Sequence, residues 1–73
     1  MAPSNGLHPV LIQHWRQVGF STRRLQGTVY HHPSIEDGHV VTTSEVREVE
    51  GETWKQGNIV RTRNTLYMLG VPG

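Results

Sequence analysis

Near the C-terminal end, the polar run Arg61-Thr62-Arg63-Asn64-Thr65 interrupts a segment that otherwise has the composition of a β-strand. On a strand, Thr62 and Asn64 would share one face and Arg61 and Arg63 the other, and neither face suits a dry interior. The run is therefore either an exposed edge strand protected by its charges or the lining of a groove. In a groove, the arginine forks would hold phosphate and Asn64 would contact a base or ribose edge.

Other residues have the chemistry to complete a nucleotide site. Trp54 and Tyr67 offer aromatic surface for stacking, which contributes about 1–3 kcal/mol per base in single-strand binders. The sequence has neither a GxxxxGK[ST] nor a GxGxxG loop, so phosphate would depend on arginines, hydroxyls and backbone N–H groups. The residues that we expect to bind ligand are Trp54, Thr62, Asn64, Arg24, Arg61 and Tyr67.

The residue types needed for catalysis are present, but their arrangement does not fit a catalytic site. His31, His32, Asp37 and Ser44 include a nucleophile, a base and an acid, as hydrolytic triads do. No strand–turn–helix pattern places the serine, and no glycine-rich oxyanion loop accompanies it. The glutamates within 45–52 have the pattern of a solvated hairpin. The sequence therefore predicts a protein that is not an enzyme.

A metal site is also not expected. His31 and His32 are adjacent, so on a strand they face opposite sides and cannot hold one ion together, although a pairing of His31 with His39 across the turn is conceivable. The chain has no cysteine, which excludes disulfides and thiolate zinc sites. We expect neither a metal nor another cofactor.

Size and composition limit the remaining possibilities. The chain has 73 residues, 34% of them hydrophobic, and a formal charge of +1. This length fits one domain over residues 1–73, and its core is small enough that we expect assembly into a homo-oligomer. The near-neutral charge disfavours a general nucleic-acid binder. Neither a membrane span nor a signal peptide is evident, so we expect a cytoplasmic protein without membrane contact.

The charges form three blocks along the chain. Residues 1–35 carry a charge of +3, residues 36–52 a charge of −5, and residues 53–73 a charge of +3. Blocks of opposite sign can pair across a sheet or between subunits. The basic residues left after pairing are expected to form a local basic concavity around Arg23, Arg24, Arg61 and Arg63.

We expect residues 1–6 to form a flexible arm and residues 7–19 to form a helix. Leu11, Trp15 and Val18 recur at helical spacing, so one face of this segment is apolar. The fold class predicted is α+β, with the N-terminal helix packed on a strongly bent antiparallel sheet or small β-barrel.

The sheet is expected to span residues 22–70. A change to alternating apolar residues predicts antiparallel strands, including a long one over residues 39–51 with a bulge near Thr43–Glu45. Asp37-Gly38 is a strong turn signal ahead of it. The tail at residues 71–73 is expected to be loose.

Two segments of the chain resemble small phage and prophage proteins. Gly27–Val46 reads G-T-V-Y-H-H-P-x-I-x-D-G-x-V-V-T-T-S-x-V, and Thr62–Gly70 reads T-R-N-T-L-Y-M-L-G. The family that they resemble most is the anti-Thoeris sponge family, whose members sequester cyclic ADP-ribose-type immune signals without degrading them. The resemblance implies a helix-plus-β protomer in a symmetric oligomer, with nucleotide pockets between subunits. It implies polar contacts from Thr62 and Asn64 and base stacking from Trp54, whereas Arg24 and Arg61 are assigned to phosphate by charge alone.

These observations favour a non-enzymatic phage-type protein that binds a small anionic nucleotide. It would sequester a cyclic ADP-ribose-type or cyclic oligonucleotide signal in the host cytoplasm and so inhibit antiphage defence. Two other functions stay open. One is a small β-barrel that binds RNA or single-stranded DNA, similar in size and element order to Sm-like proteins. The other is a protein–protein inhibitor of a host defence enzyme.

Overall fold

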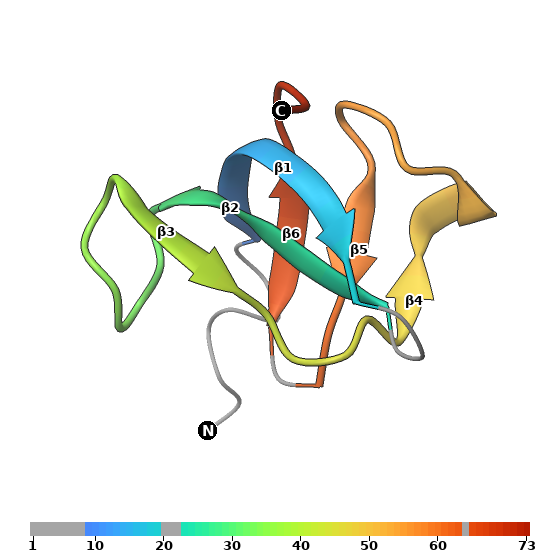
Figure 1. The fold of residues 1–73 in the computed structure, drawn as a ribbon, viewed down its shortest axis with the longest axis horizontal. Coiled ribbons are helices and arrows are strands. Elements are labelled where there is room, and N and C mark those ends of the chain that lie inside the picture. Colours follow the sequence, from blue (N-terminus) through green and yellow to red (C-terminus); the bar gives the residue numbers. More distant parts are fainter. Residues whose placement is uncertain (1–8, 20–22, 64) are drawn as a thin grey trace.

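The computed structural model describes residues 9–19, 23–63 and 65–73. Within these ranges the chain forms a mixed sheet with the strand order β3-β2-β1-β6-β5-β4 (Figure 1). Neighbouring strands are antiparallel except β1 and β6, which are parallel. The elements are β1 (Val10–Val18), β2 (Arg24–Tyr30), β3 (His39–Thr42), β4 (Glu48–Val49), the 3₁₀ turn η2 (Glu50–Glu52), β5 (Ile59–Arg61) and β6 (Leu66–Leu69).

The predicted helix over residues 7–19 is wrong, because its described part contains strand β1. Val10 and Ile12 are buried at strand spacing, and Trp15 is the next buried residue of β1. The register between β1 and β2 shifts between Gln13 and Arg16, so β1 contains a β-bulge there. The bulge inserts one extra residue into the strand, and the apolar spacing then resembles that of a helix. The α+β class is therefore replaced by a nearly all-β fold.

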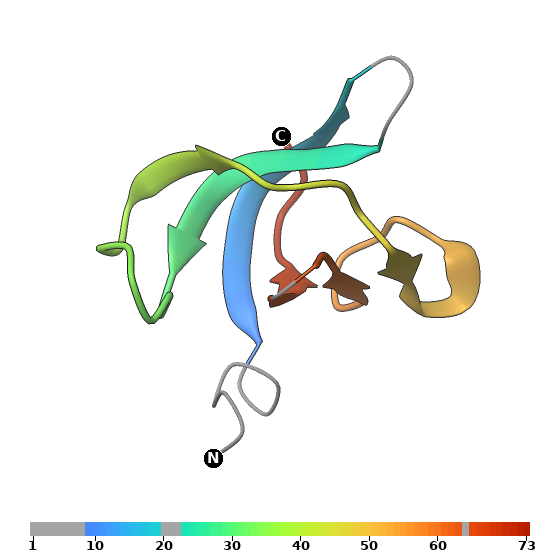
Figure 2. The same ribbon diagram turned by 90° about the horizontal axis from the view of Figure 1, so that it is seen from below.

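The sheet bends strongly, so that its two halves face each other. In Figure 1, β1 and β2 cross in front of β6, while β3 and β4 lie on opposite sides of the view, and Figure 2 shows β2 and β3 above β4, β5 and β6. The strand pairs formed among residues 22–70 are antiparallel, whereas β1, which was predicted to be a helix, joins the sheet by a parallel pairing with β6. The sheet is rich in antiparallel pairs but mixed.

The hydrophobic core lies between the two halves of the bent sheet. Trp15 is 7% exposed, and its indole Nε1–H donates a hydrogen bond of 2.8 Å to the buried carbonyl of Gly70. Its ring centroid lies 6.2 Å from that of the half-buried Trp54. The buried hydrophobic residues are Val10, Ile12, Trp15, Leu25, Val29, Val46, Val49, Val60, Tyr67 and Leu69.

The segment after β3 links the two halves of the sheet. The predicted strand over residues 39–51 is divided, because β3 lies at one edge of the sheet and β4 at the other. Thr43 begins the crossing: its buried Oγ1 accepts a hydrogen bond from the Leu25 N–H and donates one to the Ser44 carbonyl. Val46, 2% exposed, holds the crossing chain against the core. This path carries the acidic block from one half of the sheet to the other.

The C-terminal tail is bound along β1, contrary to the expectation of a loose end. The His14 N–H donates to the Val71 carbonyl at 2.6 Å, and the Gly73 N–H donates to the Trp15 carbonyl at 2.9 Å. The tail thus continues the parallel pairing of β6 past the bulge. None of the described segments forms a helix with the length and apolar character needed to span a bilayer.

Gly27 on β2 provides a test of the packing around the bulge. A Cβ atom at this buried position would lie 2.8 Å from the backbone oxygen of Gln13 and 2.8 Å from Cγ1 of Ile12. We expect Gly27→Ala to lower the free energy of unfolding by about 1–3 kcal/mol, the usual cost of overpacking, in urea denaturation. Ser44→Ala, at an exposed position, should change it by less than about 0.5 kcal/mol. An unchanged Gly27→Ala variant would contradict this packing.

Candidate anion-binding site

We call residues 43–47, which link β3 to β4, the crossing segment. Together with β5 it brings arginines from all three charge blocks to one end of the sheet. The Val46 N–H donates to the Arg23 carbonyl at 2.7 Å, and the Arg47 N–H donates to the Arg61 carbonyl at 2.8 Å. These backbone bonds fix Arg23, Arg47 and Arg61 as neighbours although they are distant in the sequence. Backbone hydrogen bonds between distant segments therefore determine where the basic charge accumulates.

A hollow of about 260 Å³ lies beside β5 and is lined by Arg47, Arg61, Thr62 and Arg63. We call it the arginine hollow. The Arg61 Nε atom lies 3.3 Å from the Glu48 carboxylate, in a pair that is largely exposed. Among the residues with described positions, Arg47 and Arg63 form no ion pair. Their uncompensated guanidinium groups suit phosphate, whose oxygens accept paired N–H donors.

The structure brings two of the predicted ligand residues, Thr62 and Arg61, to this hollow. Thr62 is 4% exposed, and both its N–H and its hydroxyl donate to the Thr65 carbonyl, at 3.0 and 3.3 Å. It therefore holds the β5–β6 turn and offers the hollow little polar surface. Asn64, predicted to read a base or ribose, lies outside the described residues.

The other predicted residues do not line the arginine hollow. Arg24 directs an Nη1–H to the Thr43 carbonyl at 3.3 Å, which fastens the start of the crossing segment. Trp54 packs on Trp15 at the core, so the structure gives it a role in packing. Tyr67 is 5% exposed on β6. No aromatic side chain is found in the described lining of the hollow.

Sequence reasoning missed Arg47, which lines the hollow. It appeared in the sequence as the single basic residue of the acidic block. Glu48 pairs with Arg61 in the antiparallel β4–β5 ladder. One residue further along the same register, Arg47 lies opposite Thr62. Arg47 could be assigned to the hollow only from this register, and the register is known only once β4 and β5 have been located.

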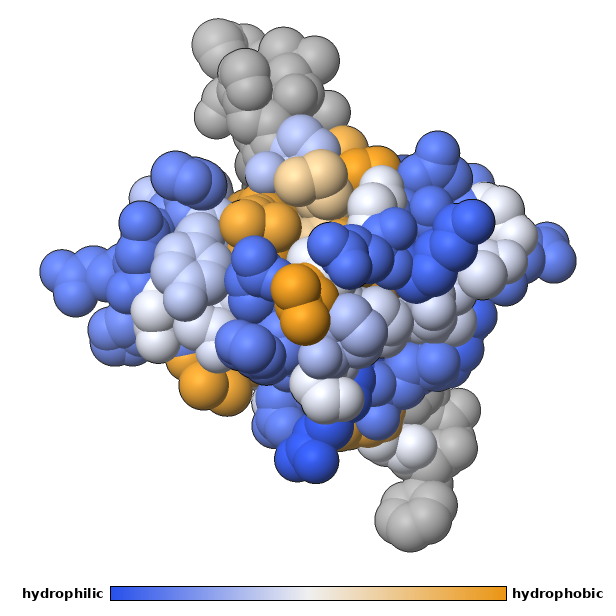
Figure 3. All heavy atoms as spheres, turned by 90° about the horizontal axis from the view of Figure 1, so that it is seen from above, coloured by the Kyte–Doolittle hydropathy of each residue, from blue (hydrophilic) through white to orange (hydrophobic). Residues whose placement is uncertain are grey.

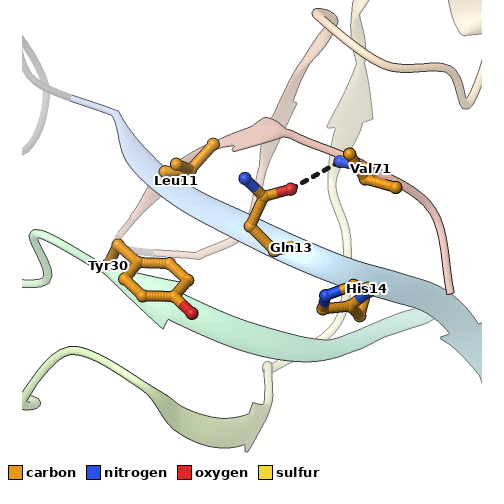
Figure 4. A pocket seen from close by; sticks show the side chains of 5 residues that line it. All are labelled: Leu11, Gln13, His14, Tyr30 and Val71. Carbon is orange, nitrogen blue, oxygen red and sulfur yellow. Dashed lines mark hydrogen bonds between the residues drawn. The ribbon is translucent and has the colours of Figure 1, made fainter.

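A second hollow, of about 280 Å³, lies at the bulge on the outer face of the sheet (Figure 4) and is lined by Leu11, Gln13, His14, Tyr30 and Val71. The Gln13 Oε1 atom accepts the Val71 N–H at 2.6 Å, as the dashed line shows. His14 has a left-handed backbone, with φ of 51°. These features serve the bulge and the docking of the tail.

Of the residues considered for catalysis or metal binding, Asp37 and His31 are joined in the turn that precedes β3. The Asp37 carboxylate accepts the backbone N–H of His31 at 2.8 Å, so it holds the turn before β3. The described part of the chain contains no group of three or more His, Cys, Asp or Glu side chains placed to hold a metal ion.

Tyr67 gives the fold a dependence on alkaline pH. Burial raises the pKa of its hydroxyl, and a hydrogen bond with Thr65 opposes this change. Because the folded pKa exceeds the unfolded one, the resulting stability is present below pH of about 10 and is lost as pH rises through the folded pKa. The urea concentration at the midpoint of unfolding, measured below and above this pH, should fall less with rising pH for Tyr67→Phe than for the natural chain. Equal slopes for Tyr67→Phe and the natural chain would contradict this account.

Comparisons of this chain with protein-family models, with curated proteins and with solved structures found no match. The arginine hollow brings three guanidinium groups together in the described part of the chain.

Proposed function

We propose that this protein is a non-enzymatic binding protein that captures a small phosphate-bearing ligand at the arginine hollow. The observation that carries the proposal is the convergence of Arg47, Arg61 and Arg63 on one hollow. Only Arg61 among them has a carboxylate partner in the described structure. Each guanidinium can donate two parallel hydrogen bonds to a phosphate, so the hollow offers more donors than its single ion pair uses.

The chemistry of the lining favours binding over turnover. A guanidinium remains protonated at any physiological pH and cannot accept a proton. The Thr62 hydroxyl is directed to the Thr65 carbonyl. The described lining contains no imidazole, and the nearby Glu48 carboxylate is paired with Arg61, so neither of the usual general bases is directed at a phosphate there. Phosphate held there would be bound rather than transferred.

The narrower form of the proposal is capture of a cyclic nucleotide-derived immune signal, as the sequence resemblance implies. The arginine hollow supports the phosphate-binding part of this idea. Trp54 packs at the core, so base stacking on it has no structural support in the single chain. A rise in melting temperature with cyclic ADP-ribose isomers or cyclic oligonucleotides at saturating concentration would support the narrower form, and no shift with either would contradict it.

We also propose that the protein associates with further copies of itself. Val40, Met68 and Val71 are 68%, 38% and 46% exposed, and Figure 3 shows apolar atoms in small patches between polar ones on the face seen from above. A core of this size is commonly supplemented by subunit contacts. Native mass spectrometry of the purified protein reports the subunit number and any small molecule that remains bound.

Variants at the hollow should change phosphate binding in opposite directions. We expect Arg63→Ala to weaken binding of inorganic pyrophosphate by about tenfold or more, because a hydrogen bond to a charged group contributes about 1.5–3 kcal/mol. Glu48→Gln should strengthen it by up to about fivefold, because the Arg61 guanidinium loses its ion-pair partner. Isothermal titration calorimetry measures both changes.

The matched control is Arg16→Ala. The Arg16 guanidinium donates to Gln26 Oε1 at 3.2 and 3.1 Å on the β1–β2 pair, so its removal should leave pyrophosphate affinity unchanged. A uniform loss in every arginine variant would indicate nonspecific charge attraction and contradict the site. Tighter binding of RNA or single-stranded DNA than of pyrophosphate, with a steep dependence on salt, would favour the nucleic-acid alternative instead.

A further inference from the structure

A hollow with charges of both signs adjoins the arginine hollow. Its volume is about 370 Å³, and its lining residues are Arg23, Arg47, Glu48, Val49 and Glu52. We call it the mixed hollow. Arg47 lines both hollows, so its guanidinium borders on each of them.

The charges of the mixed hollow are only partly neutralised by contact. Glu48 is paired with Arg61, and the neighbouring Glu50 uses its Oε1 atom to accept the Ile59 N–H at 2.9 Å. Glu52 and Arg23 form no ion pair with any residue whose position is described. Opposite charges therefore line the same hollow, and among its described residues Arg23 and Glu52 are outside ion-pair distance of any partner.

The turn that carries Glu52 is held in place by the rest of the structure. Gly51 and Glu52 both have a left-handed backbone, with φ of 62° and 55°. This conformation is unfavourable for glutamate, whose Cβ crowds the backbone there. The Asn58 side chain secures the turn, since its Nδ2 group donates to the carbonyls of Glu50 and Thr53 at 3.1 and 2.9 Å. The backbone that carries the exposed Glu52 side chain is thus constrained at the hollow.

We infer that the ligand of the two hollows is a phosphate ester whose organic part carries hydrogen-bond donors, as a sugar phosphate or a ribonucleotide does. The inference rests on the proposed function and specifies its ligand. The phosphate lies against Arg47 and Arg63, and a hydroxyl or N–H group donates to the Glu52 carboxylate, which can only accept. A second phosphate in the mixed hollow would face Glu48 and Glu52 and be repelled, so an inorganic polyphosphate is the poorer fit.

The size of the hollows agrees with such a ligand. Ligand sites usually have volumes of about 300–1,000 Å³. The arginine hollow, at about 260 Å³, falls below this range, and the mixed hollow, at about 370 Å³, lies near its lower end. A ligand that reaches both through Arg47 would have a site of ordinary size, whereas free phosphate would occupy only part of it.

The test compares four probes on the full chain by isothermal titration calorimetry: inorganic phosphate, pyrophosphate, ribose 5-phosphate and guanosine 5′-monophosphate. We expect ribose 5-phosphate to bind about tenfold more tightly than inorganic phosphate, because it adds a hydrogen bond to a charged acceptor. Glu52→Gln should remove most of this preference and leave the affinity for inorganic phosphate equal or higher. Glu45→Gln, which removes the same charge at an exposed position outside both linings, is the control and should retain the preference.

Each outcome decides between the proposals. Guanosine 5′-monophosphate binding more tightly than ribose 5-phosphate identifies a nucleotide, and equal binding identifies a sugar phosphate. Equal affinity for inorganic phosphate and both esters, unchanged in Glu52→Gln, would overturn this inference and leave the proposed function standing. No binding of any probe would overturn both. If Glu52→Gln fails to fold, Glu52→Asn replaces it, since asparagine tolerates a left-handed backbone, and loss of the preference is expected there too.

Discussion

A β-bulge in β1 turns the Trp15 indole toward the interior, and the rest of the sheet is arranged around this side chain. Its N–H donates to the Gly70 carbonyl in a buried bond between residues 55 positions apart. A buried donor left without a partner costs about 1–3 kcal/mol, so the first strand and the end of the chain are stable in one relative position. Trp54 packs against the same ring from the other half of the sheet.

This arrangement also places the arginines. Because β3 and β4 lie at opposite edges of the bent sheet, the chain between them must cross from one half to the other. The crossing ends at Arg47, which the backbone bond to Arg61 fixes beside β5. A basic cluster assembled from distant positions thus follows from the path that the core imposes. Thr62 and Trp54, which have the chemistry of ligand contacts, are used mainly to hold the turn and the core.

The sequence allowed β-structure after residue 22 to be predicted, although not the division of residues 39–51 between two strands. It also singled out Arg61 and Thr62, which line the arginine hollow, because alternation and local charge are properties of short segments. The helix was mispredicted for a physical reason: a bulge inserts one residue into the alternation of a strand and imitates a helical repeat. The role of Arg47 depends on the pairing of β4 with β5. That register links residues far apart in the chain, and no local pattern encodes it.

The central claim is that phosphate binds where Arg47, Arg61 and Arg63 converge, and NMR of the arginine Nε–Hε groups tests it most directly. On addition of inorganic pyrophosphate to the natural chain, the account predicts saturable shifts of the Arg47, Arg61 and Arg63 signals. The Arg16 signal, from a side chain bound to Gln26, should stay in place. Equal shifts at Arg16 and at the hollow, or no shift at any arginine, would contradict the account.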